Sequence, residues 1–412
     1  MPLSKHSSSS SAFASRDYRF FFASRVLSAL GHQMEVVALG WLVYAMTESA
    51  FALGLIGLAS FFPVLLMSLV SGHVADQFDR RKIAIACYAL ITAASVGLII
   101  CASIGRDALY AVYALTVLLG IARSFSNPAT QALMPTLVPR EALPNGISWS
   151  TSAWQTASIV GPALGGLLYA LGPQIVFAVA AVMFIAAAFS LFAIKTRRAP
   201  QKREPATLTA ALAGIRFMRE KPVILGAISL DLFAVLLGGA TALLPIYARD
   251  ILMTGPWGLG LLRAMPSLGA VLMGVMLARF PLARKAGSRM LIAVAIFGLA
   301  TIIFGVSTNL FLSMGALFVL GASDMISVYV RQTLVQAETP DAMRGRVSAV
   351  STVFIGASNE LGEFESGMMA AALGTVPSVI VGGLGSIVVV ALWAWLFPSL
   401  RKRDHLITPH SP

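Results

Sequence analysis

The stretch Gly72-His73-Val74-Ala75-Asp76-Gln77-Phe78-Asp79-Arg80-Arg81-Lys82 decides the fold of this 412-residue chain. Five of the seven residues from Asp76 to Lys82 are charged, whereas the whole chain is 57% hydrophobic and only 12% charged. Long apolar runs lie on both sides of the stretch. A short charged segment between two such runs is typical of a tight turn that joins two membrane helices. The stretch therefore predicts a helical membrane protein.

The composition of the whole chain supports this prediction. The mean hydropathy is +0.81, and a soluble globule would need more polar surface than this chain has. A helix needs about 20 apolar residues to cross a membrane, and the apolar runs are too long for barrel strands of about 10 residues. We expect an all-α polytopic fold with twelve spans, near residues 19–46, 51–75, 82–104, 108–128, 144–169, 173–194, 222–248, 257–280, 289–307, 310–333, 347–372 and 375–397.

The positions of lysine and arginine predict the orientation of these spans. If both termini are cytoplasmic, 24 of the 30 basic residues fall in cytoplasmic segments, and only Arg106 and Arg249 fall in outer loops. Basic residues gather on the cytoplasmic side of membrane proteins. We therefore expect both termini to be cytoplasmic. The expected location of this multi-pass protein is a bacterial-type cytoplasmic (inner) membrane. Basic loops at the anionic inner leaflet account for the net charge of +12 without nucleic acid.

A charged stretch at 195–221, which contains two prolines, divides the spans six and six. From Thr207 onward its apolar residues follow a helical spacing, which favours an amphipathic helix on the membrane surface. We expect a disordered cytoplasmic tail at 1–18, an N-terminal six-helix bundle at 19–194, the linker at 195–221, a C-terminal six-helix bundle at 222–397 and a second cytoplasmic tail at 398–412.

The two halves are related by a repeat that is visible in the sequence. A shift of 201 residues, without gaps, aligns several identical residues, among them Gln131 with Gln332, Ser150 with Ser351, and Gly161 with Gly362. This register favours an internal duplication and two parallel repeats. The same register places Arg123 opposite Asp324. The duplicated helices therefore differ in charge.

Several motifs resemble one transporter family. The pattern Gly-x-x-x-Asp-x-x-x-Arg-Arg at 72–81 resembles the loop signature of the major facilitator superfamily of secondary transporters. The sequence Gly161-Pro162-x-x-Gly165-Gly166 resembles the fifth-helix signature of its drug/proton antiporters. The resemblance covers essentially the whole chain, and the stretches that are similar to the branch with the enterobactin exporter and macrolide efflux pumps are 41–44, 127–129, 137–140 and 359–367.

This resemblance implies a function and a gate. It implies export of an amphipathic small molecule, a siderophore or a drug-like compound, by proton antiport with alternating access. It also implies that Asp76 lies near the inner end of the eleventh helix and that Arg80 belongs to a charge cluster that gates the cytoplasmic side. We assign to this gate Gly72, Asp76, Arg80, Arg81 and Arg123.

The first span carries a polar stripe. Arg25, Ser28, His32 and Glu35 are three, four and three residues apart, which places them along one helix face. An ionisable residue within a span costs about 2.5–3.5 kcal/mol, so each one indicates a function or a specific partner. His32 and Glu35 are proton-coupling candidates, since histidine titrates near physiological pH. The alternative is a structural hydrogen bond or ion pair between helices.

Asp231 in the seventh span and Asp324 in the tenth are further proton-coupling candidates. Two arrangements remain open. Asp324 pairs with Arg123 of the other repeat, or Arg123 pairs with Asp76 and Asp324 is left to titrate.

Three carboxylates lie within six residues of the eleventh span. Glu360 and Glu363 are three residues apart and lie on neighbouring faces of a helix, and both are proton-coupling candidates, whereas Glu365 points elsewhere. Three such groups are not all ionised at once, because like charges repel one another. The alternative is ion pairing with Arg263 or Arg331, or exposure to water near the middle of the helix.

Candidates for the substrate cavity are Arg25, Ser28, Trp41 and Tyr44. The small molecule, protons and membrane lipid are the expected partners, and we expect a monomer that needs no cofactor and no metal. The alternatives are an uptake symporter of the same fold and a non-transporting membrane sensor. An enzyme is not expected, because the sequence contains no Walker A, HExxH or Gly-x-Ser-x-Gly motif.

Overall fold

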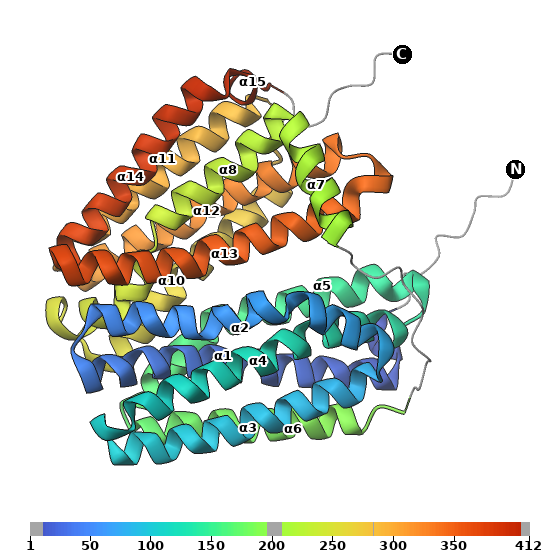
Figure 1. Ribbon diagram of the computed structural model, residues 1–412, viewed down its shortest axis with the longest axis vertical. Coiled ribbons are helices and arrows are strands. Elements are labelled where there is room, and N and C mark those ends of the chain that lie inside the picture. Colours follow the sequence, from blue (N-terminus) through green and yellow to red (C-terminus); the bar gives the residue numbers. More distant parts are fainter. Residues whose placement is uncertain (1–10, 196–207, 283, 405–412) are drawn as a thin grey trace, which may run out of the picture. The chain divides into compact units, whose positions relative to one another are not determined.

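The computed structural model describes residues 11–195, 208–282 and 284–404, and these residues form helices joined by short turns, with no strand among them (Figure 1). The first half contains η1 Ala12–Ala14, α1 Arg16–Thr47, α2 Ala50–Gln77, α3 Arg80–Ile104, η2 Arg106–Ala108, α4 Leu109–Leu133, η3 Met134–Thr136, η4 Arg140–Ala142, α5 Leu143–Tyr169 and α6 Pro173–Phe192.

The second half begins with the helix α7 and ends with the short helix α15. It contains α7 Leu208–Glu220, α8 Pro222–Leu237, η5 Ala240–Leu243, α9 Leu244–Ile246, η6 Tyr247–Ile251, α10 Gly255–Arg279, α11 Ala286–Val306, α12 Leu310–Glu338, α13 Asp341–Leu373, α14 Thr375–Leu396 and α15 Pro398–Arg401.

Ten helical segments of the described part are long and apolar enough to cross a membrane. Two further helices, α5 with 27 residues and α13 with 33, are as long but carry more polar residues. With these two, the long segments follow the twelve-span order that the sequence predicts. The polytopic all-α fold is thereby confirmed.

Contacts divide the chain into two compact units, residues 1–38 with 62–205 and residues 39–61 with 206–412. Within the first unit α3 packs against α4 and α6, and α5 packs against α6. Within the second unit α12 packs against α10 and α11, and α8 and α11 both pack against α14. These units differ from the predicted bundles at residues 39–61, where α1 ends and α2 begins, since these residues make their contacts with the second unit.

The seventh span is interrupted, whereas the sequence predicts one helix over 222–248. The helix α8 ends at Leu237, and a 3-10 turn, a single α turn and the π turn η6 follow it. The break lies at Gly238-Gly239, where a Cβ on Gly239 would come within 2.6 Å of the carbonyl carbon of Gly362. Glycine allows this close approach of two backbones.

The predicted tails are partly structured where the structure describes them. The Ala12 N–H donates to Asn145 Oδ1 at 3.0 Å, and the Phe13 ring packs edge-on against Tyr18 and Trp149. Residues 11–18 are therefore packed onto the first unit, while 1–10 lie outside the described residues. At the other end α15 packs against α8, and 405–412 lie outside the described residues.

The linker contains a helix where the sequence predicts one. The helix α7 packs against α13, and Met218 on its inward face is only 4% exposed. Arg216 and Glu220 lie on its outward face and form an exposed ion pair. The rest of the linker, 196–207, lies outside the described residues.

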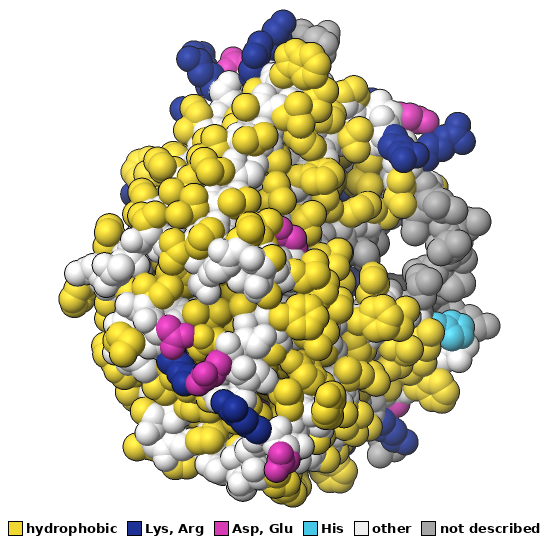
Figure 2. All heavy atoms as spheres, turned by 60° about the vertical axis from the view of Figure 1, so that its left-hand side comes forward, with side chains coloured by type: hydrophobic (Ala, Val, Ile, Leu, Met, Phe, Trp, Pro, Cys, Tyr) yellow, Lys and Arg dark blue, Asp and Glu magenta, His cyan; other side chains and the backbone are white. Residues whose placement is uncertain are grey.

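Hydrophobic side chains cover most of the face shown in Figure 2, and Lys and Arg occupy only small patches of it. On α6, for example, Val182, Ile185, Phe189 and Phe192 are all exposed. An apolar surface of this extent needs an apolar surrounding. The acyl chains of a bilayer provide such a surrounding.

Candidate functional site

A buried ion pair joins α1 and α4 in the first unit. Arg123 Nη2 of α4 donates to Glu35 Oε2 of α1 at 3.1 Å, and Ser95 Oγ of α3 donates to Glu35 Oε1 at 2.5 Å. Glu35 is 0% exposed, and so is Ser95. Burial of a carboxylate is tolerated when both oxygens are paired in this way. The site therefore ties three helices of the unit together.

A second buried cluster joins α8 and α12 in the second unit. Arg331 Nη1 lies 3.0 Å from Asp231 Oδ2, and Ser327 Oγ donates to Asp231 Oδ1 at 3.2 Å. Asp231 is 4% exposed and Arg331 is 2% exposed. Asp324 of α12 lies beside them and lines one small cavity with Asp231 and Ser327.

The two clusters have the same construction. In each repeat an acid on the first helix pairs with an arginine on the fourth, as Glu35 with Arg123 and Asp231 with Arg331. In the 201-residue register Arg331 aligns with Thr130, seven residues beyond Arg123. Seven residues correspond to about 10 Å along a helix. Measured in the register of the repeat, the Asp231–Arg331 pair therefore lies about two helical turns away from the position of the Glu35–Arg123 pair.

The clusters differ in charge. The first contains one carboxylate and one guanidinium, whereas the second contains Asp231 and Asp324 with Arg331 alone. The two aspartates are close enough to repel each other electrostatically. A buried group of net negative charge is costly, and binding one proton removes that charge. The two clusters therefore differ in net charge when all of their groups are ionised.

The acidic run of α13 faces a third arginine. Glu363 Oε1 lies 3.9 Å from Arg263 Nη2 of α10 and accepts a long hydrogen bond of 3.5 Å from Thr241 Oγ1. Glu360 and Glu363 are both half-buried. Of the two arginines that the sequence left open as partners of this run, the structure places Arg263 beside Glu363 and Arg331 beside Asp231.

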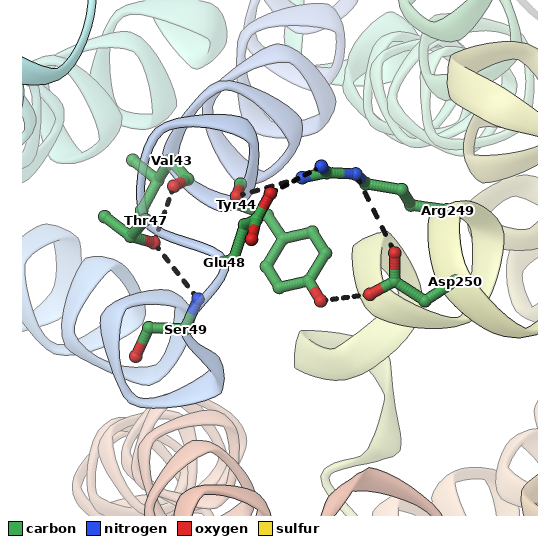
Figure 3. Close-up of polar contacts among 7 residues, drawn as sticks. All are labelled: Val43, Tyr44, Thr47, Glu48, Ser49, Arg249 and Asp250. Atoms are coloured by element: carbon green, nitrogen blue, oxygen red, sulfur yellow. Dashed lines mark hydrogen bonds and ion pairs between the residues drawn. The ribbon is translucent and has the colours of Figure 1, made fainter.

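A fourth polar cluster lies where α1 ends and η6 begins, and Figure 3 shows its residues. The Tyr44 hydroxyl donates to Asp250 Oδ2, and Arg249 Nη2 donates to Glu48 Oε1 at 2.7 Å. The Arg249 guanidinium also lies over the Tyr44 ring, 5.4 Å from its centroid. Tyr44, a predicted cavity residue, is thus held in a hydrogen-bonded cluster of the second unit.

The polar stripe of the first span lies along α1, as its spacing predicts. Ser28 Oγ accepts a hydrogen bond from the Tyr88 hydroxyl at 3.2 Å. The Arg25 guanidinium lies 5.5 Å from the Trp154 ring centroid, and the His32 ring stacks on the same indole at 5.9 Å. Trp41, further along α1, is half-buried.

The arginines of the charged turn donate hydrogen bonds to carbonyl groups at the ends of helices. Arg80 donates from Nε to the Ala75 carbonyl at 3.1 Å and from Nη1 to the Ala132 carbonyl, at the end of α4, at 3.0 Å. Arg81 donates from Nη2 to the Phe192 carbonyl, at the end of α6, at 2.7 Å. Cations stabilise the carbonyl ends of helices. The turn therefore joins the ends of α2, α4 and α6.

Two further gate candidates lie near this turn. Gly72 is in the last two turns of α2, and a Cβ built on it would meet nothing within 4 Å. Asp76 is in the last turn of α2, but its side chain is outside the described part of the structure. Their assignment to a gate remains a prediction.

The Gly161-Pro162-x-x-Gly165-Gly166 motif packs α5 closely against α1. A Cβ on Gly161 would lie 2.5 Å from Gln33 Cβ, and one on Gly165 would lie 3.0 Å from Met34 Cα. Pro162 is inside α5, and Gly166 is buried. Small residues allow this close approach of two helices. The motif thus supports the segment of α1 that carries Glu35.

We expect Gly161→Ala to lower the unfolding temperature of the protein in detergent, because the added methyl group collides with α1. Gly315→Ala is the matched control, since Gly315 also lies in a helix but has nothing within 4 Å of its Cβ position. Alanine in an open helical position stabilises by about 0.5–1 kcal/mol relative to glycine. Equal unfolding temperatures for the two variants would contradict the tight packing.

The sequence does not identify the partners of several residues. It left Asp324 and Asp76 open as partners of Arg123, and the structure places Arg123 beside Glu35. The repeat contains a signal that finds both pairs, since each half has an acid in its first span and an arginine in its fourth. The contacts of Asp250 with Tyr44 and of Arg249 with Glu48 have no comparable signal.

Comparison with known proteins matches nearly the whole chain to one family. The sequence model of the family MFS_3, described as transmembrane secretion effectors, matches residues 7–409. The enterobactin exporter EntS of Citrobacter koseri is 26% identical over 386 residues, which are 93% of this chain and 92% of that protein. EntS of Escherichia coli O1:K1 / APEC is 25% identical over the same shares of the two chains.

Solved structures share the fold at low sequence identity. A bacterial homologue of the human lysosomal transporter Spinster, in an inward-facing and occupied conformation, has a TM-score of 0.74 at 14% identity and covers 93% of this chain and 96% of its own. A bacterial homologue of the iron transporter ferroportin, in an inward-facing state, has a TM-score of 0.71 at 16% identity and covers 94% and 99%.

Proposed function

Because the chain belongs to the transmembrane secretion effectors of the major facilitator superfamily, a family of transporters and not of enzymes, we propose that it exports an amphipathic small molecule by proton antiport with alternating access. The substrate is a siderophore or a drug-like compound. The observation that carries the proposal is the similarity to enterobactin exporters over more than nine tenths of both chains.

Proton coupling is supported by the cluster in the second unit. Asp231 and Asp324 share a cavity while one guanidinium, that of Arg331, lies beside them. Proton relays in membrane transporters use acids of this kind, buried within the spans. Asp324 is therefore the first candidate for the coupled proton, and Glu35, His32, Glu360 and Glu363 are further candidates. The paired Asp231 then acts as the counter-ion of Arg331.

The protein is a multi-pass membrane transporter, and its finer placement is part of the proposal. Both termini lie in the cytoplasm of a bacterial cell, as the distribution of its basic residues favours. The charged segment at 72–82 comprises the end of α2, a short turn and the start of α3. It then lies on the cytoplasmic side, where Arg80 and Arg81 serve the gate. The transporter acts as a monomer surrounded by lipid.

Flux in reconstituted vesicles tests the proposal. Purified protein is placed in inside-out vesicles, a proton gradient is imposed, and uptake of a siderophore and of several drug-like compounds is followed with and without an uncoupler. We expect accumulation of at least one compound that the uncoupler abolishes. Flux in the opposite direction would show an uptake symporter, and an absence of flux for every compound would favour a membrane sensor.

A deletion strain separates the two substrate classes. Cells that lack the transporter are tested in parallel for susceptibility to compounds and for siderophore retained inside the cell. Retained siderophore with unchanged susceptibility supports a siderophore exporter, and the reverse result supports a drug exporter.

A further inference from the structure

Each unit contains one pocket at the junction of its fourth and fifth helices. The first pocket, about 440 Å³, lies where α4 ends and α5 begins and is bordered by Phe21 and Arg25 of α1. The second pocket, about 510 Å³, lies where α12 ends and α13 begins. Ligand pockets have volumes of roughly 300–1,000 Å³. Both are thus large enough for a ring system of moderate size.

The two pockets are related by the internal repeat. Seven residues that line the first pocket have their counterparts, 201 residues later, in the lining of the second. Among these pairs are Gln131 and Gln332, Ser150 and Ser351, and Trp154 and Ile355. The duplication that produced the two halves therefore duplicated this pocket.

The chemistry of the two pockets has diverged. Ile147 of the first pocket corresponds to Ser348 of the second, and the indole of Trp154 corresponds to the aliphatic Ile355. Phe21, which is 3% exposed, also lines the first pocket. An aromatic wall favours ring stacking, whereas an amide and hydroxyl lining favours hydrogen bonds. Only the first pocket has acquired aromatic walls.

The first pocket also contains an available positive charge. Arg25 is half-buried, with its guanidinium over the face of Trp154, and no carboxylate of the described residues lies within ion-pair distance of it. The residue that corresponds to Arg25 in the second repeat is Gly226. The arginine of the second pocket, Arg331, is bound to Asp231. An anion would therefore find a partner in the first pocket and not in the second.

We propose that the first pocket binds an aromatic group that carries a negative charge, such as an aryl carboxylate. The ring packs against Trp154 and Phe21, and the anion accepts hydrogen bonds from the planar donor group of Arg25. The amide of Gln131 lies in the same lining and is a further donor. The role of this pocket in transport rests on the proposed export function, whereas its affinity for the anion does not.

Equilibrium binding to the full-length protein in lipid nanodiscs tests this proposal. The probes are radiolabelled 2-naphthoate, the cation 2-naphthylmethylamine, and cyclohexanecarboxylate, which keeps the charge without the aromatic ring. We expect 2-naphthoate to bind most tightly. Trp154→Ile, which introduces the residue of the second pocket, and Arg25→Gln should each weaken its binding by about tenfold.

Two controls keep the test independent of folding. Trp154→Phe keeps an aromatic face and should bind 2-naphthoate more tightly than Trp154→Ile. Gln336→Ala alters the second pocket and should leave the affinity unchanged. Equal binding of the cation and the anion, or an unchanged affinity in Trp154→Ile, would overturn the proposal.

The same samples separate this inference from the export function. If proton-driven flux of a compound persists while 2-naphthoate does not bind, the pocket assignment is wrong and export stands. If 2-naphthoate binds as expected while no compound is transported, the pocket assignment stands and the export function is wrong.

Discussion

Asp324→Asn should reduce proton-driven export to the level of vesicles without protein, while exchange of substrate between the two sides continues. An asparagine keeps the size of the side chain but cannot bind and release a proton. Asp324 lines a small cavity together with Asp231 and Ser327, and Arg331 pairs with Asp231 beside it. If the surplus acid carries the coupled proton, its removal uncouples transport from the gradient.

The measurement compares two fluxes in the same vesicles. Uptake driven by an imposed proton gradient should disappear, and exchange of labelled for unlabelled substrate at equal pH should remain near that of the unchanged protein. Asp107→Asn is the matched control, because Asp107 is an exposed acid in the turn η2. Gradient-driven export by Asp324→Asn at the normal rate would remove Asp324 from the mechanism.

Arg331→Met should destabilise the protein more than any other single change that we propose. Arg331 is 2% exposed and pairs with Asp231 at 3.0 Å, and Asp324 lies beside the pair. Loss of one partner of a buried pair costs about 3–5 kcal/mol, because the remaining charge is buried without compensation. Here two carboxylates would lose their shared counter-ion.

Unfolding in detergent, followed by circular dichroism against temperature or denaturant, measures this effect. The double change Arg331→Met with Asp231→Asn should recover much of the loss, since the unpaired charge is removed together with its partner. Arg216→Met is the control, because Arg216 forms an exposed pair on α7 and such pairs contribute little. Equal stability of Arg331→Met and Arg216→Met would contradict the buried ion pair.

Much of the fold could be predicted because membrane helices are encoded locally. Backbone groups within a bilayer must be satisfied inside the segment itself, so every span needs a continuous apolar run. The predicted span 82–104 and the observed α3, Arg80–Ile104, agree for this reason. The exception is the seventh span, whose break at Gly238-Gly239 depends on the approach of Gly362 from a distant helix.

The candidate sites could be predicted only in part. The stripe from Arg25 to Glu35 follows from helical spacing alone. The interactions of these residues do not follow from spacing, because their partners lie on other helices. Arg25 contacts Trp154 of α5. Glu35 contacts Arg123 of α4 and Ser95 of α3. The contacts of the charged turn could not be predicted either. Its arginines contact the ends of α4 and α6, which are far away in the sequence.

The sequence by itself determined that this protein is a polytopic helical membrane protein with an internal repeat, and its motifs pointed to a family of transporters. Hydropathy, charge bias, motifs and the 201-residue register are properties of neighbouring residues or of a fixed shift along the chain. Only the tertiary structure decided which acid is paired, which carboxylate is in excess and which of two duplicated pockets has aromatic walls and an available arginine. The physical reason is that a buried charge or ring acquires its chemistry from the helices packed around it, and that packing brings together residues that no local pattern connects.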